Sequence, residues 1–283
     1  MKDLGRRLAV SSVSIVIVVG LLLFAYQDIF QYAVALLVAG LAGVAIWEYE
    51  QFAKAKGGRM ILPALIGITM CEVFAFFLSA RYPSMDSLPL IVFFLGFLVL
   101  FALHFRQRDG AVVDLSVSSF GLLYIAIPLG MLLGILYISS ALEDGRWWVA
   151  YLLVVTKITD IGAYFAGSLW GRRKLAPHIS PGKTVEGALF GLVCAILASY
   201  GFHFLSSYSG AVHFELGTYE WLFLGLTLGA TGQFGDLSES LLKRDANKKD
   251  SNALPGLGGV LDSVDSLLFN APIIYFYLQY IKP

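Results

Sequence analysis

Long apolar stretches alternate with short polar segments along nearly the whole chain of 283 residues. Each stretch has about the length that an α-helix needs to cross a hydrocarbon core of about 30 Å. The pattern predicts about nine transmembrane helices, near residues 8–26, 29–47, 61–80, 88–103, 115–138, 147–170, 185–207, 221–237 and 260–281. No small-residue cleavage site follows the first stretch, so it is expected to remain as a membrane anchor. We therefore expect an all-α, polytopic integral membrane protein.

Composition supports a membrane location. Hydrophobic residues make up 58% of the chain and charged residues only 14%, which is outside the usual range of soluble domains. If the N-terminus is cytoplasmic, most of the 20 Lys and Arg residues fall in loops on the cytoplasmic side, as the positive-inside rule requires. We expect a location in the inner (cytoplasmic) membrane of the cell, with the active site facing the cytoplasm. No nucleic-acid partner is expected, and the sequence leaves a homodimer open.

Polarity divides the chain into two regions. Residues 1–140 are almost wholly apolar within the predicted helices and are expected to pack and to face lipid. Residues 141–283 carry nearly all polar groups at membrane depth, together with the predicted cytoplasmic loops 171–184 and 239–259. Ionisable residues within the membrane are costly and usually functional. The second region is therefore the predicted site of chemistry.

The first polar group begins at Lys157 and Asp160. On a helix, Asp160 shares a face with Ala163 and Gly167, so a carboxylate stands above a groove of small residues. An internal ion pair between Lys157 and Asp160 and a ligand-binding role for Asp160 are both open. The basic residues of the loop that follows, at 172–174, fit either the positive-inside rule or phosphate binding.

A second group lies at the end of the eighth predicted helix. Asp236, Ser240 and Lys243 follow at steps of four and three, so they share a helical face. Asp236 is the favoured ligand here. Glu239, one turn away, is expected either to replace Asp236 or to neutralise Lys243.

A dense run of charges then leads into the ninth predicted helix. It contains Lys243, Arg244, Lys248, Lys249, Asp250, Asp262 and Asp265. Asp262 and Asp265 share a helical face after a glycine turn. Acidic residues can simply complement a helix N-terminus, but two carboxylates at the mouth of an apolar helix favour a metal site. Cations followed by paired carboxylates are what a site that handles phosphates through a divalent metal requires.

These motifs resemble the phosphatidate cytidylyltransferases (CDP-diacylglycerol synthases). One region matches that family's pattern S-x-x-K-R, K-D, Pro, Gly-Gly and D-x-x-D, with Ser240, Lys243, Arg244, Lys249, Asp250, Pro255, Gly258, Gly259, Asp262 and Asp265. An earlier region matches an aspartate, A-Y, spaced glycines and S-P-x-K-T-x-E-G, with Asp160, Ala163, Tyr164, Gly167, Gly171, Ser180, Pro181, Lys183, Thr184, Glu186 and Gly187. Two regions in the right order are far more specific than either alone.

The resemblance implies that CTP and phosphatidate react to give CDP-diacylglycerol and pyrophosphate, with membrane lipids as surroundings. It implies Mg²⁺ as cofactor, held by Asp236, Asp262 and Asp265, and leaves a second cation open. Lys243, Arg244, Asp262 and Asp265 are the expected catalytic residues. The expected substrate-binding residues are Asp160, Lys183, Thr184, Glu186, Ser240, Lys249 and Asp250.

Two positions depart from the family pattern, which usually has His at Leu257 and Arg at Ser263. Neither is a proposed metal ligand, although the second removes a cation from between the two aspartates. A CTP-dependent kinase acting on a polyprenol or phytol is the closest alternative. A secondary transporter is less favoured, since the chain has no corresponding halves and its charges cluster towards one side of the membrane.

Overall fold

The chain is helical through most of its length, as predicted. A computed structural model describes residues 16–105, 109–138, 143–209, 214–248 and 259–282. Its long helices are α2 (Phe30–Ala55), α3 (Leu62–Arg81), α4 (Leu88–His104), α5 (Ala111–Gly121), α6 (Ile127–Leu136), α7 (Gly145–Trp170), α8 (Val185–Ser209), α9 (Glu220–Asp245) and α10 (Val260–Phe276). Short 3₁₀ and π segments are η1 (Pro83–Met85), η2 (Leu122–Ala126) and η3 (Tyr277–Ile281).

Six helical segments of the described residues are long and apolar enough to cross a membrane. They are Phe30–Ala55, Leu62–Arg81, Pro83–His104, Ala111–Leu136, Gly145–Trp170 and Val185–Tyr208. The predicted helix 221–237 falls within the more polar α9, and 260–281 begins with the 17 residues of α10. The first predicted helix, 8–26, lies partly outside the described residues. Of its described part, residues 16–24 are helical. Integral membrane character is therefore confirmed, while the count of nine and the cytoplasmic N-terminus stay predictions.

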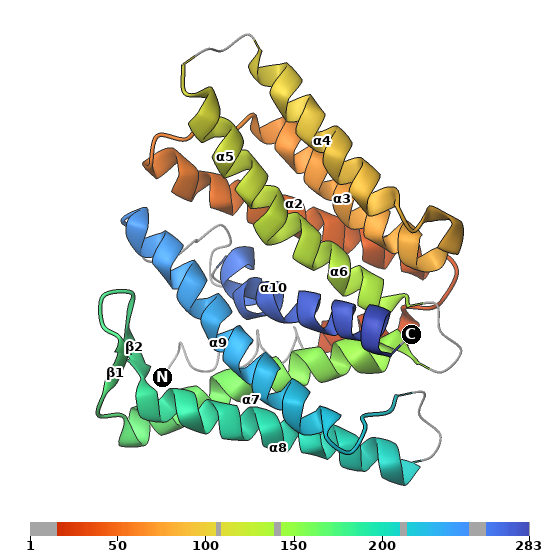
Figure 1. Cartoon of the computed structure of the whole chain (residues 1–283), viewed down its shortest axis with the longest axis vertical. Coiled ribbons are helices and arrows are strands. Elements are labelled where there is room, and N and C mark those ends of the chain that lie inside the picture. Colours follow the sequence, from red (N-terminus) through yellow and green to blue (C-terminus); the bar gives the residue numbers. More distant parts are fainter. Residues whose placement is uncertain (1–15, 106–108, 139–142, 210–213, 249–258, 283) are drawn as a thin grey trace.

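Helix α10 lies between two groups of helices (Figure 1). It packs against α2 and α6 on one side and against α7 and α9 on the other. Helices α7 and α8 run side by side for much of their lengths, and α9 packs across α8. Helix α10 thus packs against α7 and α9 of the region 141–283 and also against α2 and α6 of the region 1–140.

Small residues let these helices approach closely. A Cβ on Gly187 of α8 would lie 2.6 Å from the carbonyl oxygen of Ala163 in α7. A Cβ on Gly235 of α9 would lie 2.6 Å from the carbonyl oxygen of Asp265 in α10. Such contacts between small residues are the usual means of tight packing in membranes, where burial from water does not drive helices together.

The predicted cytoplasmic loop 171–184 contains an antiparallel hairpin. Strand β1 (Lys174–Ala176) pairs with β2 (Ser180–Thr184), with Lys174 opposite Thr184 and Ala176 opposite Ser180. Glu186 holds the approach to this hairpin, because its carboxylate accepts from the backbone N–H groups of Arg172 at 3.0 Å and Arg173 at 3.2 Å. The other predicted loop, 239–259, begins as helix, since α9 continues to Asp245.

Charged contacts gather at two ends of the helices. At one end Lys56 pairs with Asp245 at 2.7 Å, and Arg244 Nε donates to the carbonyl oxygen of Ile179 in the hairpin at 3.1 Å. At the other end Lys282 pairs with Glu143 at 2.7 Å. The predicted cytoplasmic loops 171–184 and 239–259 therefore meet in space through Ile179 and Arg244.

Candidate functional site

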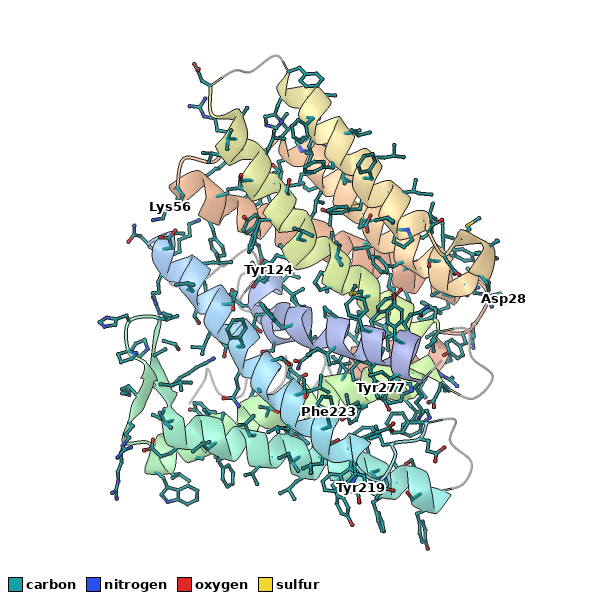
Figure 2. All side chains as sticks on the ribbon, viewed as in Figure 1. Asp28, Lys56, Tyr124, Tyr219, Phe223 and Tyr277 are labelled. Carbon is teal, nitrogen blue, oxygen red and sulfur yellow. The ribbon has the colours of Figure 1, made fainter. Side chains whose placement is uncertain are left out.

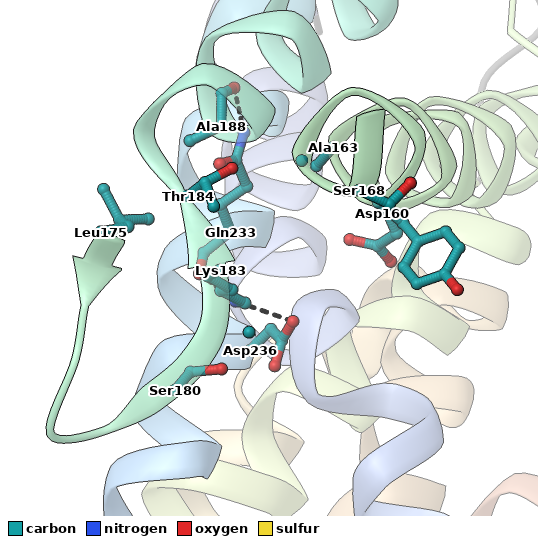
Figure 3. Close-up of a pocket in the computed structure, with 13 residues that line it drawn as sticks. Asp160, Ala163, Ser168, Leu175, Ser180, Lys183, Thr184, Ala188, Gln233 and Asp236 are labelled. Carbon is teal, nitrogen blue, oxygen red and sulfur yellow. Dashed lines mark hydrogen bonds and ion pairs between the residues drawn. The ribbon is translucent and has the colours of Figure 1, made fainter. Parts of the chain in front are cut away.

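A cavity of about 300 Å³ opens between α7, the hairpin, α8 and α9. Its polar lining consists of Asp160, Ser168, Ser180, Lys183, Thr184, Gln233 and Asp236, with Tyr164 beside them. Figure 3 shows Lys183 extending from β2 to Asp236, with Asp160 on the α7 side of the cavity. The earlier of the two motif regions, 160–187, therefore supplies most of the lining, and α9 adds Gln233 and Asp236.

Lys183 is fixed by α9. Its Nζ lies 2.7 Å from Asp236 Oδ2 and 3.5 Å from the carbonyl oxygen of Gln233, and these two residues are one turn apart. Gln233 in turn donates through Nε2 to the carbonyl oxygen of Ala188 at 3.1 Å. Gln233 was not predicted as a site residue, although its spacing of three from Asp236 was the available signal.

Three carboxylates from three helices interact electrostatically. Asp265 of α10 experiences the negative charges of Asp236 and Asp160, and Asp160 experiences the positive charges of Lys157 and Lys183. Asp265 is buried, with 7% of its surface exposed. Carboxylates kept together at depth need cations to offset their repulsion.

Lys157 makes a different contact from the ion pair considered above. Its Nζ lies 3.5 Å from the carbonyl oxygen of Ser263, and within the described part of the chain it forms no salt bridge with Asp160. Ser263 stands where the family pattern has Arg. The ammonium group of Lys157 on α7 therefore lies close to Ser263, the position at which the family pattern has a positively charged Arg.

A second charged cluster surrounds Lys243. Its ammonium group lies 2.8 Å from Asp262 Oδ1 and also pairs with Glu239, one turn earlier on α9. Asp262 Oδ2 accepts from the backbone N–H of Gly259 at 3.2 Å, so Asp262 also caps the start of α10. The structure thus divides the three predicted metal ligands, with Asp236 and Asp265 in one cluster and Asp262 in the other.

Other predicted residues have local structural contacts. Thr184 Oγ1 accepts from the N–H of Gly187 at 3.1 Å and caps α8. Glu186 contacts the backbone just before β1, and Arg244 contacts Ile179 between the two strands. Ser240 is half-buried on α9. Lys249, Asp250 and Leu257 lie outside the described residues.

The chemistry of the carboxylates fits Mg²⁺ bound together with phosphates. In the described part of the chain no group of three or more His, Cys, Asp or Glu side chains is arranged to hold a metal. Mg²⁺, however, usually takes only one or two carboxylates and completes its shell with waters and substrate phosphate oxygens. Asp236 and Asp265, with Asp160 nearby, can supply such hard oxygen ligands.

Comparisons with known proteins show the family of the chain. The chain is 36% identical to a phosphatidate cytidylyltransferase of Chlamydia pneumoniae, over 98% of this chain and 92% of that protein. It is 33% identical to a phosphatidate cytidylyltransferase of Bacillus subtilis, over 86% and 87%, and 36% identical to one of Staphylococcus haemolyticus, over 65% of each. The sequence model of the cytidylyltransferase family matches residues 6–281. The chain belongs to the cytidylyltransferase family.

Proposed function

We propose that this protein is a phosphatidate cytidylyltransferase, which transfers the cytidylyl group of CTP to phosphatidate. The full-length match to relatives of that name supports the assignment. The single structural observation that carries it is the cavity in which Lys183, Asp160 and Asp236 meet beside membrane-length helices. A lysine and carboxylates in a cavity beside membrane-length helices suit two substrates, a nucleotide with several phosphates and a lipid.

The reaction needs charge stabilisation more than proton transfer. A phosphate oxygen of phosphatidate attacks the α-phosphorus of CTP, the bond from that phosphorus to the bridging oxygen of the β-phosphate breaks, and pyrophosphate leaves. The attacking oxygen is already anionic, so no strong general base is required. The site must instead hold several negative charges together while the leaving group departs.

Residues of the cavity and of the helices around it share this task. Lys183 supplies positive charge at the cavity wall, and Asp236 and Gln233 fix its position before substrate arrives. Lys157 supplies a second cation near Ser263. Lys243 is held between Glu239 and Asp262, and the third N–H donor of its ammonium group remains for a phosphate. Arg244 keeps the hairpin against α9.

In this proposal Asp236 and Asp265 hold Mg²⁺ with Asp160 nearby, and Asp262 takes part through Lys243. When bound, the ion would offset the negative charge of the triphosphate and of the pyrophosphate that leaves. The basic residues of the hairpin and of the end of α9 support a cytoplasmic orientation of the site in the inner membrane.

The test is turnover by the purified protein in detergent with Mg²⁺, CTP and phosphatidate. We expect CDP-diacylglycerol and pyrophosphate in equal amounts, measured by mass spectrometry and a pyrophosphate assay. In a parallel reaction with a polyprenol in place of phosphatidate, formation of CDP and a phosphorylated polyprenol would instead assign the protein as a kinase. If the folded protein makes neither product, the proposed function is wrong.

A further inference from the structure

Helix α10 is held at its first turn by a buried carboxylate from the N-terminal half of the chain. Glu48 of α2 is fully buried. Its Oε1 accepts from the backbone N–H of Val260 at 2.9 Å, and its Oε2 accepts from that of Leu261 at 2.7 Å. The first N–H groups of a helix have no partner within the helix. Glu48 therefore satisfies two of them and brings negative charge to the positive end of the helix.

The same face of α2 also contacts the end of α9. Gln51, one turn after Glu48, accepts through Oε1 from Lys248 Nζ at 3.1 Å. Lys56, just beyond the end of α2, pairs with Asp245 at 2.7 Å, and Figure 2 shows Lys56 beside the end of α9. Helix α2 thus contacts the chain both at 245–248 and at 260–261.

The first two turns of α10 carry residues of both charged clusters. Asp262 directly follows Leu261 and pairs with Lys243 of α9. Asp265, one turn later, lies against Gly235, the neighbour of Asp236. A rotation or shift of these turns therefore changes the distances between the α10 carboxylates and their α9 partners.

We propose that Glu48 is a positioning residue, which fixes the first turn of α10 and so sets where Asp262 and Asp265 lie relative to α9. The kinetic consequence of this inference rests on the proposed function, whereas the hydrogen bonds of Glu48 are independent of that function. It gives a role in the reaction to the region 1–140, which the sequence assigned to packing. A carboxylate buried this completely is costly unless it is hydrogen-bonded, and the two amides of α10 are among the partners that stabilise it here.

The test compares Glu48→Gln with the matched control Glu50→Gln. Glu50 is also buried on α2, but its carboxylate pairs with Lys54 of the same helix. Glutamine at position 48 keeps the size and one acceptor oxygen, but turns an N–H₂ group towards a backbone N–H. We expect amide hydrogen exchange in peptides covering 259–265 to become about tenfold faster in Glu48→Gln and to stay unchanged in Glu50→Gln.

The kinetic readout separates positioning from simple anchoring. We expect kcat of Glu48→Gln to fall by about 10- to 100-fold, while KM for CTP stays within about threefold, because misplaced groups lose transition-state stabilisation more than ground-state binding. Unchanged exchange at 259–265 would overturn the contact, and faster exchange with normal kcat would overturn the positioning role. If Glu48→Gln does not fold, Glu48→Asp, which keeps the charge on a shorter side chain, is measured in the same two assays. Absence of turnover in the wild-type protein would overturn the proposed function, and exchange would still test the contact.

Discussion

The close approach of α9 and α10 at Gly235 makes a quantitative prediction. A Cβ at this position would lie 2.6 Å from the carbonyl oxygen of Asp265, 3.0 Å from the Phe269 ring and 3.1 Å from the Cα of Ser266. Ordinary contacts of a Cβ begin at 3.4 Å, so Gly235→Ala must separate the two helices by about 0.8 Å at this point, the difference between 3.4 and 2.6 Å. Two of the three obstacles are backbone atoms, which cannot rotate away as a side chain can.

Overpacking of this kind costs about 1–3 kcal/mol of folding free energy. A displacement of about 1 Å at a reacting centre costs up to about 100-fold in rate. Since Asp236 and Asp265 lie on either side of the contact, we expect kcat for CDP-diacylglycerol formation to fall by about 10- to 100-fold in Gly235→Ala. The melting temperature of the protein in detergent is also expected to fall.

The matched control is Gly201→Ala on α8, where nothing lies within 4 Å of an added Cβ. Alanine in a helix interior is favoured over glycine by up to about 1 kcal/mol, so this variant should keep its activity and melt at the same temperature or higher. If Gly235→Ala keeps both its activity and its melting temperature, close α9–α10 packing is not what places the two carboxylates.

Three further predictions follow from other contacts. Asn270 is fully buried and hydrogen-bonds Thr156 of α7 at 2.8 Å and Thr231 of α9 at 2.6 Å, so Asn270→Leu should lose about 1 kcal/mol at about 0.6 kcal/mol for each interhelical bond. An unchanged denaturation midpoint in mixed micelles would contradict this. Asp236→Asn should reduce CDP-diacylglycerol formation by at least about 100-fold while the variant stays folded, and near-normal turnover would remove Asp236 from the proposed metal site. Arg244→Ala should release the hairpin at Ile179 and raise KM for CTP by about tenfold; initial-rate kinetics that match the wild type would show that the hairpin does not need this contact.

Much of the fold could be predicted because helix length and apolar composition are local properties. The predicted range 147–170 corresponds to α7, and 88–103 corresponds to α4, each within a residue or two at its ends. The hairpin could not be predicted in the same way. Its strands are three and five residues long, and they are held by contacts from Glu186 and Arg244 that lie outside them in sequence.

The residues of the candidate site could be predicted from the sequence, but which of them pair with one another could not. Helical spacing correctly put Asp236 and Lys243 on α9, but spacing alone does not show that Asp236 pairs with Lys183 and Lys243 with Asp262. Those partners depend on how α9 lies between the hairpin and α10. Glu48 carried no signal at all, since it follows the predicted helix 29–47 and nothing in the local sequence separates it from Glu50 or reveals a contact with a backbone more than two hundred residues away.

The two boundaries of the cavity differ in polarity, so a lipid and a water-soluble reactant can enter it from different sides. Tyr164 lines the cavity and is 73% exposed, and its neighbour Phe165 is 58% exposed, on a helix apolar enough to lie in a bilayer. The hairpin on the other side carries the exposed Arg172, Arg173 and Lys174. One boundary of the cavity therefore matches hydrocarbon and the other matches water, so an amphiphile can stay in its leaflet, diffusing in two dimensions, while an ionic partner arrives in three.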